Sequence, residues 1–326
     1  MTSETAAPHS QAEPPLRDAE PPKDMPFVSV AIITLNSRST VQQCLQALTS
    51  LDYPKDRYEI VIVDGGSTDG TTDLLRRFPV RVVLDKRRNR GMARNTAINN
   101  CKGKIVAFTD ADCIPLRSWL TDHVSIHGDP HVLVAAGSVL QGGDLGLPTT
   151  IYHETYFATQ SPHTPRRKTW EIASANASFK ASTFSTVGPF PELDRGEESL
   201  LSWRVIQAGF EVVFDPSPKV IHIHPRMSYR SLFGRSWDEG YSDRCLQSAF
   251  GENPPFHLPR SFAAVLALSP SLSIARAGKY FVKLLLGGYN NISTLISIPI
   301  LLATSFYWLH GYMTASRHGG MQSHAR

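Results

Sequence analysis

Short, almost wholly apolar runs alternate with stretches of helical character between residues 28 and 109. The apolar runs are 28–34 (VSVAIIT), 59–64 (EIVIVD), 80–84 (VRVVL) and 104–109 (KIVAFT). Apolar residues recur three or four positions apart in 40–50, and 71–77 and 91–100 also suit helices. Strands with few polar positions, separated by helices, are typical of a parallel sheet covered on both faces. We therefore predict an α/β fold here.

The two ends of the chain differ from this middle part. Residues 1–26 contain six of the 23 prolines and almost no large apolar side chains, so we expect a disordered tail. Residues 284–309 contain no charged residue and are long enough to cross a bilayer or to lie in its surface. Gly287, Gly288 and Pro299 lower the apolar character of this segment. The alternative to a membrane segment is therefore a pair of buried helices. We expect a helical region over 228–326 that attaches to a membrane.

Charge and cysteine content indicate the cellular compartment and the kind of partner that the protein binds. The net charge of +4 is too small to indicate nucleic acid, and the basic run 86–90 fits phosphate contact or plain surface better. The four cysteines show no CxxC spacing, which favours reduced thiols. The N-terminus lacks the basic and apolar regions of a secretory signal. We expect a cytoplasmic catalytic domain that is held at the membrane by its C-terminal segment.

Polar residues follow the ends of the predicted strands, where ligands bind in parallel sheets. Asn36 follows the first run, and Asp64 opens the loop DGGSTDG after the second. A carboxylate at a strand tip can accept hydrogen bonds from a base or a sugar. The alternative is an ordinary turn in which Asp69 or Ser67 caps the next helix. The spacing matches neither a dinucleotide fingerprint nor a Walker loop.

Two aspartates, Asp110 and Asp112, follow the fourth run in the triplet DAD. Crowded carboxylates after a buried strand are costly unless a cation or solvent compensates for them. Hard oxygen ligands suit Mg²⁺ or Mn²⁺ bound together with substrate phosphates. A solvated turn is the alternative.

The order of several motifs resembles one family. SVAIITLN, EIVIVDGGSTDGT, NRGMARN and KIVAFTDADC follow one another, and ASANASFK, VGPFP and RGEESLLSWRVIQAGF come later. Together they look like the nucleotide-sugar domain of family 2 glycosyltransferases. The resemblance covers roughly residues 27–225, and we set the domain at 27–227. It implies the GT-A fold, which is Rossmann-like with a mostly parallel sheet and helices on both faces.

The resemblance also implies roles for the first strand ends. Thr34 and Asn36 would flank the nucleotide pocket, and Asp64 would contact a uracil or guanine edge. Asp69, in the same loop, is a further candidate for substrate binding.

For the diphosphate side, the resemblance places Arg90 and Arg94 near the base or the phosphates. Asp110 would lean toward the ribose and Asp112 would bind Mn²⁺ or Mg²⁺, with His224 of VIHIHP completing the metal or diphosphate site. A core or surface histidine is the alternative for His224.

On the acceptor side, the family has a Glu-Asp pair at the start of a helix, where this chain has Glu197 and Glu198. Glu198 would be the general base, and Arg204 matches an arginine further along that helix. Stabilisation of a helix N-terminus by negative charge is the alternative role for both glutamates. The stretch 142–167 shows little periodicity and is expected to be an irregular connection or a loop over the acceptor.

The implied reaction is an inverting, metal-dependent transfer of a sugar from a nucleoside-diphosphate sugar to an acceptor hydroxyl. The uncharged C-terminal segment suggests a lipid-linked or glycan acceptor. Two other functions stay open: a sugar nucleotidyltransferase, and a non-catalytic membrane adaptor that retains the fold. The absence of a QxxRW motif argues against a processive synthase.

Overall fold

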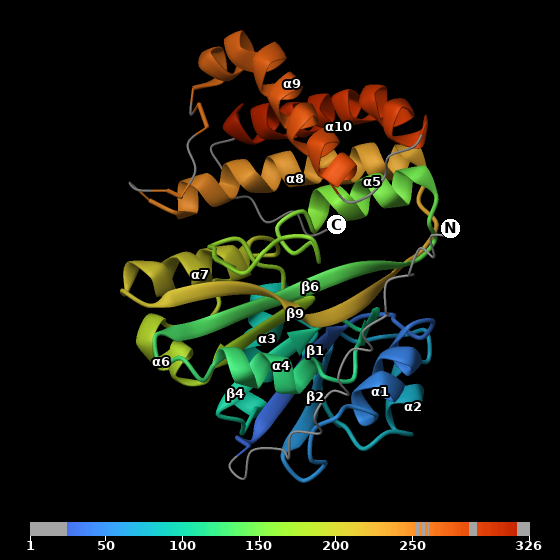
Figure 1. Ribbon diagram of the computed structural model, residues 1–326, viewed down its shortest axis with the longest axis vertical. Helices are drawn as coiled ribbons and strands as arrows, with labels where there is room; N and C mark the ends of the chain where they lie inside the picture. Colours follow the sequence, from blue (N-terminus) through green and yellow to red (C-terminus); the bar gives the residue numbers. More distant parts are fainter. Residues whose placement is uncertain (1–24, 252–253, 256–257, 260, 287–291, 318–326) are drawn as a thin grey trace, which may run out of the picture.

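The computed structural model describes residues 25–251, 254–255, 258–259, 261–286 and 292–317 (Figure 1). Nearly all of the tail expected at 1–26 therefore lies outside the described residues. The strands are β1 Val28–Thr34, β2 Tyr58–Asp64, β3 Arg81–Leu84, β4 Ile105–Thr109, β5 Cys113–Pro115, β6 Val132–Gly143, β7 Arg167–Lys168, β8 Asn176–Lys180 and β9 Glu211–His224. The helices are α1 Val41–Thr49, α2 Thr71–Leu75, α3 Arg90–Asn100, α4 Trp119–Ile126, α5 Leu147–Tyr156, α6 Ser182–Val187, α7 Glu197–Gln207, α8 Tyr229–Ala249, α9 Phe262–Leu286 and α10 Ile292–Arg317.

The strands form one mixed sheet in the order β3-β2-β1-β4-β8-β6-β9-β5, with β7 paired to β9. The expected parallel sheet is confirmed for β1 to β4, which all pair in parallel. Beyond β4 the sheet is mixed, because β8 runs antiparallel to both β4 and β6 while β6 and β9 are parallel. The parallel half places the ends of β1, β2 and β4 at one edge.

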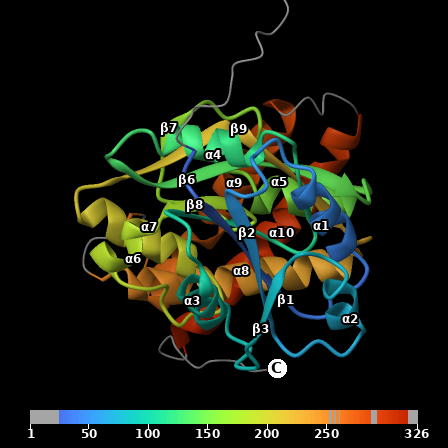
Figure 2. The same cartoon turned by 90° about the horizontal axis from the view of Figure 1, so that it is seen from below.

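Helices cover both faces of this sheet, as predicted. Alternate side chains of β1 point to opposite faces, so Val30 and Ile32 pack in the same apolar cluster as Leu45 of α1. Ala31 instead belongs to the cluster that contains Ala97 of α3. Figure 2 shows α1 and α3 on opposite sides of β1 and β2.

A buried polar network ties the second half of the sheet to α4. Asn176 on β8 accepts a hydrogen bond from Trp119 Nε1 at 2.8 Å, and its Oδ1 lies 2.8 Å from His123 Nε2. Its amide nitrogen donates to the carbonyls of Ser138 (2.7 Å) and Pro218 (2.9 Å). The Asn176 side chain, in the motif ASANASFK, thus provides hydrogen-bond partners for polar groups on β6, α4 and β9.

The C-terminal region is helical, as predicted, but its uncharged segment is not one helix. The uncharged segment 284–309 is divided between the end of α9 and most of α10, and residues 287–291 lie outside the described part. Helices α8, α9 and α10 pack together, and α5 contacts all three of them (Figure 1). Within the described residues, no helix combines the length and the apolar character that crossing a membrane requires.

The stretch 142–167 also differs from its prediction, because it contains α5. The buried side chains of this helix include Ile151, Tyr152 and His153, which pack against neighbouring elements rather than following a clear helical repeat along the sequence. Its position between the sheet and the C-terminal helices explains this pattern.

Candidate active site

The ends of β1 and β2 meet as the topology predicts. Thr34 and Asp64 are partners in the parallel register, and Gly65 N donates to Thr34 O at 2.8 Å. The hydroxyl oxygen of Thr34 is buried and has no hydrogen-bond partner among the described residues. A buried polar atom without a partner is costly, so this edge leaves a position that a ligand could satisfy.

Asp64 organises the loop that follows it. Its Oδ2 accepts hydrogen bonds from Gly66 N (3.0 Å) and Ser67 N (2.9 Å), and its Oδ1 accepts from Ser67 Oγ (2.5 Å). Asn36, in the left-handed conformation with φ of 53°, accepts a hydrogen bond from Thr68 N at 2.9 Å. The two loops expected to hold the nucleotide are therefore joined to each other.

Asp69 lies in this loop with both carboxylate oxygens bonded. Oδ1 accepts hydrogen bonds from Thr71 N (2.9 Å) and Thr71 Oγ1 (2.5 Å), while Oδ2 accepts from Arg38 N (3.1 Å). Hydrogen bonding to Thr71 lowers the pKa of this carboxyl. The N-cap of α2 is Gly70, so Asp69 is not its N-cap residue; its hydrogen bonds to Thr71 and Arg38 shape the loop before the helix.

Carboxylates and a histidine gather beyond β4. Potential ligand atoms of Asp110, Asp112, Cys113 and His222 lie within 4.8 Å of one another. The cause is the antiparallel pairing of β5 with β9, in which Cys113 faces His222. His222 Nε2 is 3.5 Å from Asp112 Oδ1, and His222 Nδ1 is buried without a partner in the described part of the chain.

The electrostatics of this cluster favour a cation. Burial raises the pKa of Asp110 and of Asp112, and the charge of Asp112 raises that of Asp110 further. Burial lowers the pKa of His222, which keeps the ring neutral and able to ligate. Burial also raises the pKa of Cys113 well above its usual value, so the thiol stays protonated. The carboxylates of Asp110 and Asp112 supply the oxygen ligands that suit Mn²⁺ or Mg²⁺, and His222 lies beside them.

The structure places His222, rather than the expected His224, beside the aspartates. The Nε2 atom of His224 is 2.9 Å from His153 Nδ1 on α5, and its ring stacks on His222 at 4.2 Å. Burial lowers the pKa of His224 to about 3. His224 therefore packs behind the cluster and orients its neighbour.

A second group joins α3 to the start of α7. Arg94 donates hydrogen bonds to Glu197 Oε1 and to Ser174 Oγ, and its Nη2 lies 3.4 Å from Glu198 Oε1. Glu198 Oε1 also accepts from Ser174 Oγ at 2.9 Å and from Ser174 N at 3.3 Å. These contacts all fall on Oε1 of Glu198, and no hydrogen bond from another described residue reaches Oε2.

The two glutamates differ in their protonation preferences. Burial, followed by the charge of Glu198, raises the pKa of Glu197. Burial also opposes the charged form of Glu198, but Arg94 and the Ser174 hydrogen bonds outweigh it, so the pKa of Glu198 is lowered. Glu198 is thus held as a carboxylate with one oxygen available to accept a proton.

Arg90 interacts electrostatically with Glu197 at the start of α7 and with the aspartates after β4. Burial opposes its charge, but Tyr156, Glu197 and Asp110 raise its pKa overall, and its charge also acts on Asp112. Arg204 lies apart from them: its Nη1 donates to Pro189 O at 3.3 Å, and it lines a separate hollow with Trp203. Arg90 thus connects the aspartates with Glu197, whereas Arg204 lies apart from both, and Asp64, Asn36 and Asp69 are bonded within their own loops.

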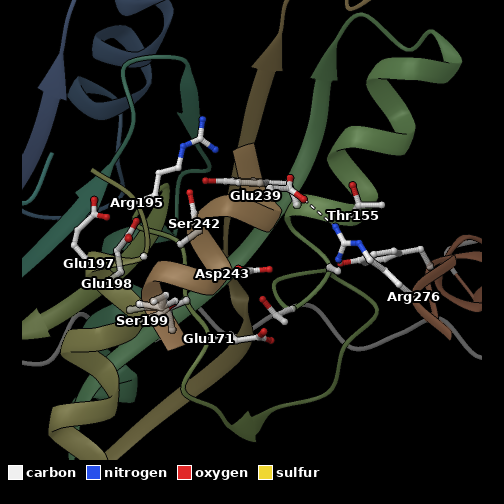
Figure 3. Close-up of a pocket in the computed structure, with 18 of the residues that line it drawn as sticks. Thr155, Glu171, Arg195, Glu197, Glu198, Ser199, Glu239, Ser242, Asp243 and Arg276 are labelled. Carbon is white, nitrogen blue, oxygen red and sulfur yellow. Dashed lines mark hydrogen bonds and ion pairs between the residues drawn. The ribbon is translucent and has the colours of Figure 1, made fainter. Parts of the chain in front are cut away.

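A cavity opens in front of the glutamates. Glu197, Glu198, Arg90 and Tyr156 line it, and its other side is formed by α8 and α9 (Figure 3). Sequence reasoning missed Ser174 and the residues of α8 and α9, whereas Tyr156 lies in the stretch 142–167 that was a candidate loop over the acceptor. Ser174 lies in the quoted motif ASANASFK, whereas no local pattern marks the residues of α8 and α9.

Comparisons with known proteins identify the family and the fold. A family model described as Glycosyl transferase family 2 matches residues 29–187. Glycosyltransferase AglE of Haloferax volcanii is 30% identical over 223 residues, which cover 66% of this chain and 72% of AglE. The probable glycosyltransferase YdaM of Bacillus subtilis is 27% identical over 210 residues, 60% of this chain and 50% of YdaM. The chain thus spans most of one relative and half of the other.

Solved structures share the fold. The mannosyltransferase PcManGT from Pyrobaculum calidifontis, in complex with GDP-Man and Mn²⁺, has a TM-score of 0.61 at 22% identity and covers 93% of this chain and 89% of that one. Residues 1–349 of S. aureus TarS, in complex with UDP-GlcNAc, have a TM-score of 0.55 at 16% identity and cover 90% of this chain and 92% of that one.

Fold and site together define a glycosyltransferase with a GT-A fold that uses a nucleotide sugar. The chain belongs to glycosyltransferase family 2. This assignment rules out the two other functions that the sequence left open, because it makes the chain an enzyme of the sugar-transferring class.

Proposed function

We propose that this enzyme transfers a sugar from a nucleoside-diphosphate sugar to an acceptor hydroxyl with inversion at the anomeric carbon, and that it requires a divalent cation. One observation carries this proposal. The charge of Arg90 acts both on Glu197, the neighbour of the carboxylate Glu198, and on Asp110 and Asp112, which with His222 form a cluster that suits a cation.

The residues that would hold Mn²⁺ or Mg²⁺ are Asp110, Asp112 and His222. The buried, unpartnered Nδ1 of His222 and the raised pKa values of the aspartates fit such an ion. When bound, the cation neutralises charge on the diphosphate of the leaving group. Arg90 adds a positive charge at the same edge.

The chain's own residues perform the proton transfer. Glu198 Oε2 takes the proton of the acceptor hydroxyl, and the acceptor oxygen forms a bond to the anomeric carbon. The bond from that carbon to the diphosphate oxygen breaks, and its electron pair leaves with the nucleoside diphosphate. Arg94 and Ser174 orient the carboxylate through Oε1. A positioned base contributes about 10²–10⁴-fold in rate.

The donor is proposed to be a uridine or guanosine diphosphate sugar. The Asn36 and Asp64 loops, with the unpartnered hydroxyl of Thr34, supply polar atoms for the nucleoside. PcManGT and TarS, which share the fold, were solved with GDP-Man and UDP-GlcNAc.

The helices α9 and α10 support attachment to a membrane surface rather than insertion across it. Neither helix contains an acidic residue. Large apolar side chains are exposed on both, among them Leu266 and Ile274 of α9 and Leu302 and Phe306 of α10. Apolar side chains with flanking positive charge are what an interfacial helix presents to lipid. Such an attachment would suit a lipid-linked acceptor.

The decisive experiment measures nucleoside diphosphate release from a panel of uridine and guanosine diphosphate sugars, with Mn²⁺, with Mg²⁺ and with EDTA. We expect release from at least one donor, dependent on the cation and lost in Asp112→Asn. Undiminished release in EDTA would contradict the metal requirement, and pyrophosphate release from nucleoside triphosphates would contradict the transfer reaction.

A further inference from the structure

The cluster beyond β4 contains a sulfur atom as well as oxygen and nitrogen atoms. Cys113 follows Asp112 directly in the chain, and its Sγ lies within 4.8 Å of the ligand atoms of Asp110, Asp112 and His222. The register explains this position, because Cys113 on β5 pairs with His222 on β9. The function proposed above uses the two aspartates and the histidine, and it leaves the thiol without a role.

A cation that binds sulfur would find a full set of ligands here. Mn²⁺ and Mg²⁺ prefer oxygen, whereas Zn²⁺ binds cysteine sulfur, histidine nitrogen and carboxylate oxygen. With bonds of about 2.0–2.3 Å, the ligand atoms of a tetrahedral zinc site lie about 3.3–3.7 Å apart. His222 Nε2 and Asp112 Oδ1 are 3.5 Å apart, so this pair already has the separation of two zinc ligands. Small movements of the other side chains, whose ligand atoms lie within 4.8 Å, would complete the site.

The thiol is protonated until such a cation binds. Cys113 is 0% exposed, and burial, with the charges of Asp110 and Asp112, raises its pKa well above the ordinary value. A doubly charged cation between the aspartates reverses their effect, and a thiol that coordinates zinc loses its proton outright. The S–H bond breaks, the electron pair of the sulfur forms the bond to zinc, and the proton passes to water.

The number of protein ligands decides what the bound cation can do. A zinc ion with four protein ligands is closed, whereas a catalytic ion keeps a position for substrate. Mn²⁺ prefers octahedral coordination, so two carboxylates and a histidine leave it positions for the oxygens of the diphosphate. A tetrahedral Zn²⁺ ion that also binds the thiol has no such position.

We propose that Cys113, together with the two aspartates and His222, forms a closed Zn²⁺ site at the position of the catalytic cation, and that Zn²⁺ bound there inhibits the enzyme by excluding the diphosphate of the donor. The inhibition rests on the proposed function, because it takes this cluster as the site of the catalytic cation. The zinc site itself rests on the geometry of the four side chains.

Co²⁺ is the spectroscopic probe for the site, because it takes the same tetrahedral ligands as Zn²⁺ and its bond to a thiolate absorbs in the near ultraviolet. The full chain is freed of metal with EDTA, dialysed and titrated with Co²⁺. We expect one equivalent of Co²⁺ to produce the thiolate charge-transfer band and the strong visible bands of a tetrahedral complex, and one equivalent of Zn²⁺ to remove both. A cobalt complex without the charge-transfer band would overturn the site.

The variants Cys113→Ser and Cys113→Ala identify the sulfur ligand. We expect each to lose the band and to raise the Kd for Zn²⁺, measured by calorimetry, at least about tenfold, which is the loss that even an outer-shell partner of a metal causes. Cys101→Ser is the matched control, because Cys101 lies at the end of α3 and is not one of the four clustered residues, and it should keep the parental band and Kd. The spectrum of the parent tests for a sulfur ligand even if a variant folds poorly.

Two results with these variants would contradict the assignment to Cys113. One is a parental Kd for Zn²⁺ in both of them. The other is persistence of the charge-transfer band, which would indicate the neighbouring thiol of Cys44, whose Sγ lies 3.5 Å from Asp110 O.

Inhibition is measured as nucleoside diphosphate release from the best donor at saturating Mn²⁺. We expect a slight excess of Zn²⁺ over the chain to abolish most of the release, and a zinc-selective chelator to restore it. Full release with Zn²⁺ bound would show that the site stays open and would overturn the inhibition. If the parent releases no nucleoside diphosphate with Mn²⁺, the proposed function fails and the inhibition fails with it, while the cobalt spectrum and the Kd for Zn²⁺ still decide the zinc site.

Discussion

Arg94 on α3 and Glu198 on α7 approach each other in the interior of the site, with Arg94 Nη2 3.4 Å from Glu198 Oε1. The same guanidinium binds Glu197, so one cation serves two adjacent buried carboxylates. One cation cannot fully stabilise two charges at low dielectric, and the pKa values of the pair separate. The pKa of Glu198 falls and that of Glu197 rises. This separation favours Glu198 over Glu197 as the base in the proposed mechanism.

Replacing Arg94 should move the acidic limit of activity. The pKa of Glu198 lies below its ordinary value of 4.5. Above pH 4.5 the side chain is therefore ionised and contributes its full stabilisation of the folded state. Both are lost as the pH falls through the lowered pKa. In Arg94→Met this pKa should rise by about 1–3 units, because an opposite charge is lost. The acidic limb of a kcat–pH profile should shift upward by that amount.

Arg204→Met is the control for this profile, because Arg204 lies on the same helix but bonds to Pro189 O. Its acidic limb should coincide with that of the parent. Coincident limbs for Arg94→Met and the parent would show that Arg94 does not set the protonation of Glu198.

Glu198→Gln should reduce turnover and leave donor binding almost unchanged. Glutamine keeps the shape and can still bond to Ser174, but it cannot take a proton, so kcat should fall about 10²–10⁴-fold. The measurements are nucleoside diphosphate release at saturating donor and the thermal shift that the donor produces with Mn²⁺. Glu197→Gln is the comparison, and a larger loss there than in Glu198→Gln would move the base to Glu197.

His222→Ala should weaken Mn²⁺ binding more than His224→Ala does. Only His222 lies with the aspartates, whereas His224 bonds to His153. We expect an increase of at least about tenfold in the Kd for Mn²⁺, or about 1.4 kcal/mol, in His222→Ala, measured by calorimetry. Equal effects of the two substitutions would argue against His222 as a ligand.

This histidine pair shows where sequence reasoning reaches its limit. The pattern VIHIHP placed both histidines on one face of a strand, and that is how they lie. Choosing between them required the register of β9 against β5, which pairs His222 with Cys113. Because the partner strand is far away in the sequence, no local pattern contains that register.

The predictions that held depend on short-range patterns. The apolar runs gave β1 to β4, and the chain order of parallel strands brought Asp64 and the DAD triplet to one edge. The α8 and α9 side of the cavity was missed because its residues are isolated charges in helices. Asp69 and Arg204 were candidates by sequence, but Asp69 bonds to Thr71 and Arg38 N, and Arg204 bonds to Pro189 O.

Substitutions on the outer surface of α9 and α10 should reduce membrane binding. Ile274 is 64% exposed and Phe306 is 63% exposed. The double variant Ile274→Asp/Phe306→Asp should lose most of its co-sedimentation with vesicles containing anionic lipid, because aspartate places charge where apolar groups would enter the interface. Leu84→Asp, on β3 and 60% exposed in the parent, is the control. Equal sedimentation of all three proteins would contradict attachment through this surface.

The crossing of α8 and α10 should depend on two glycines. A Cβ atom at Gly240 would lie 1.8 Å from Trp308 O, and one at Gly311 would lie 2.0 Å from Trp237 O. Both contacts are with backbone, so the helices must separate to admit even a methyl group. Gly240→Ala should therefore lower the free energy of unfolding by about 1–3 kcal/mol, as overpacking does. Gly234, on the same helix α8, has open space at its Cβ position, and Gly234→Ala should instead stabilise by about 0.4–1 kcal/mol. Urea unfolding of the two variants measures this difference in sign.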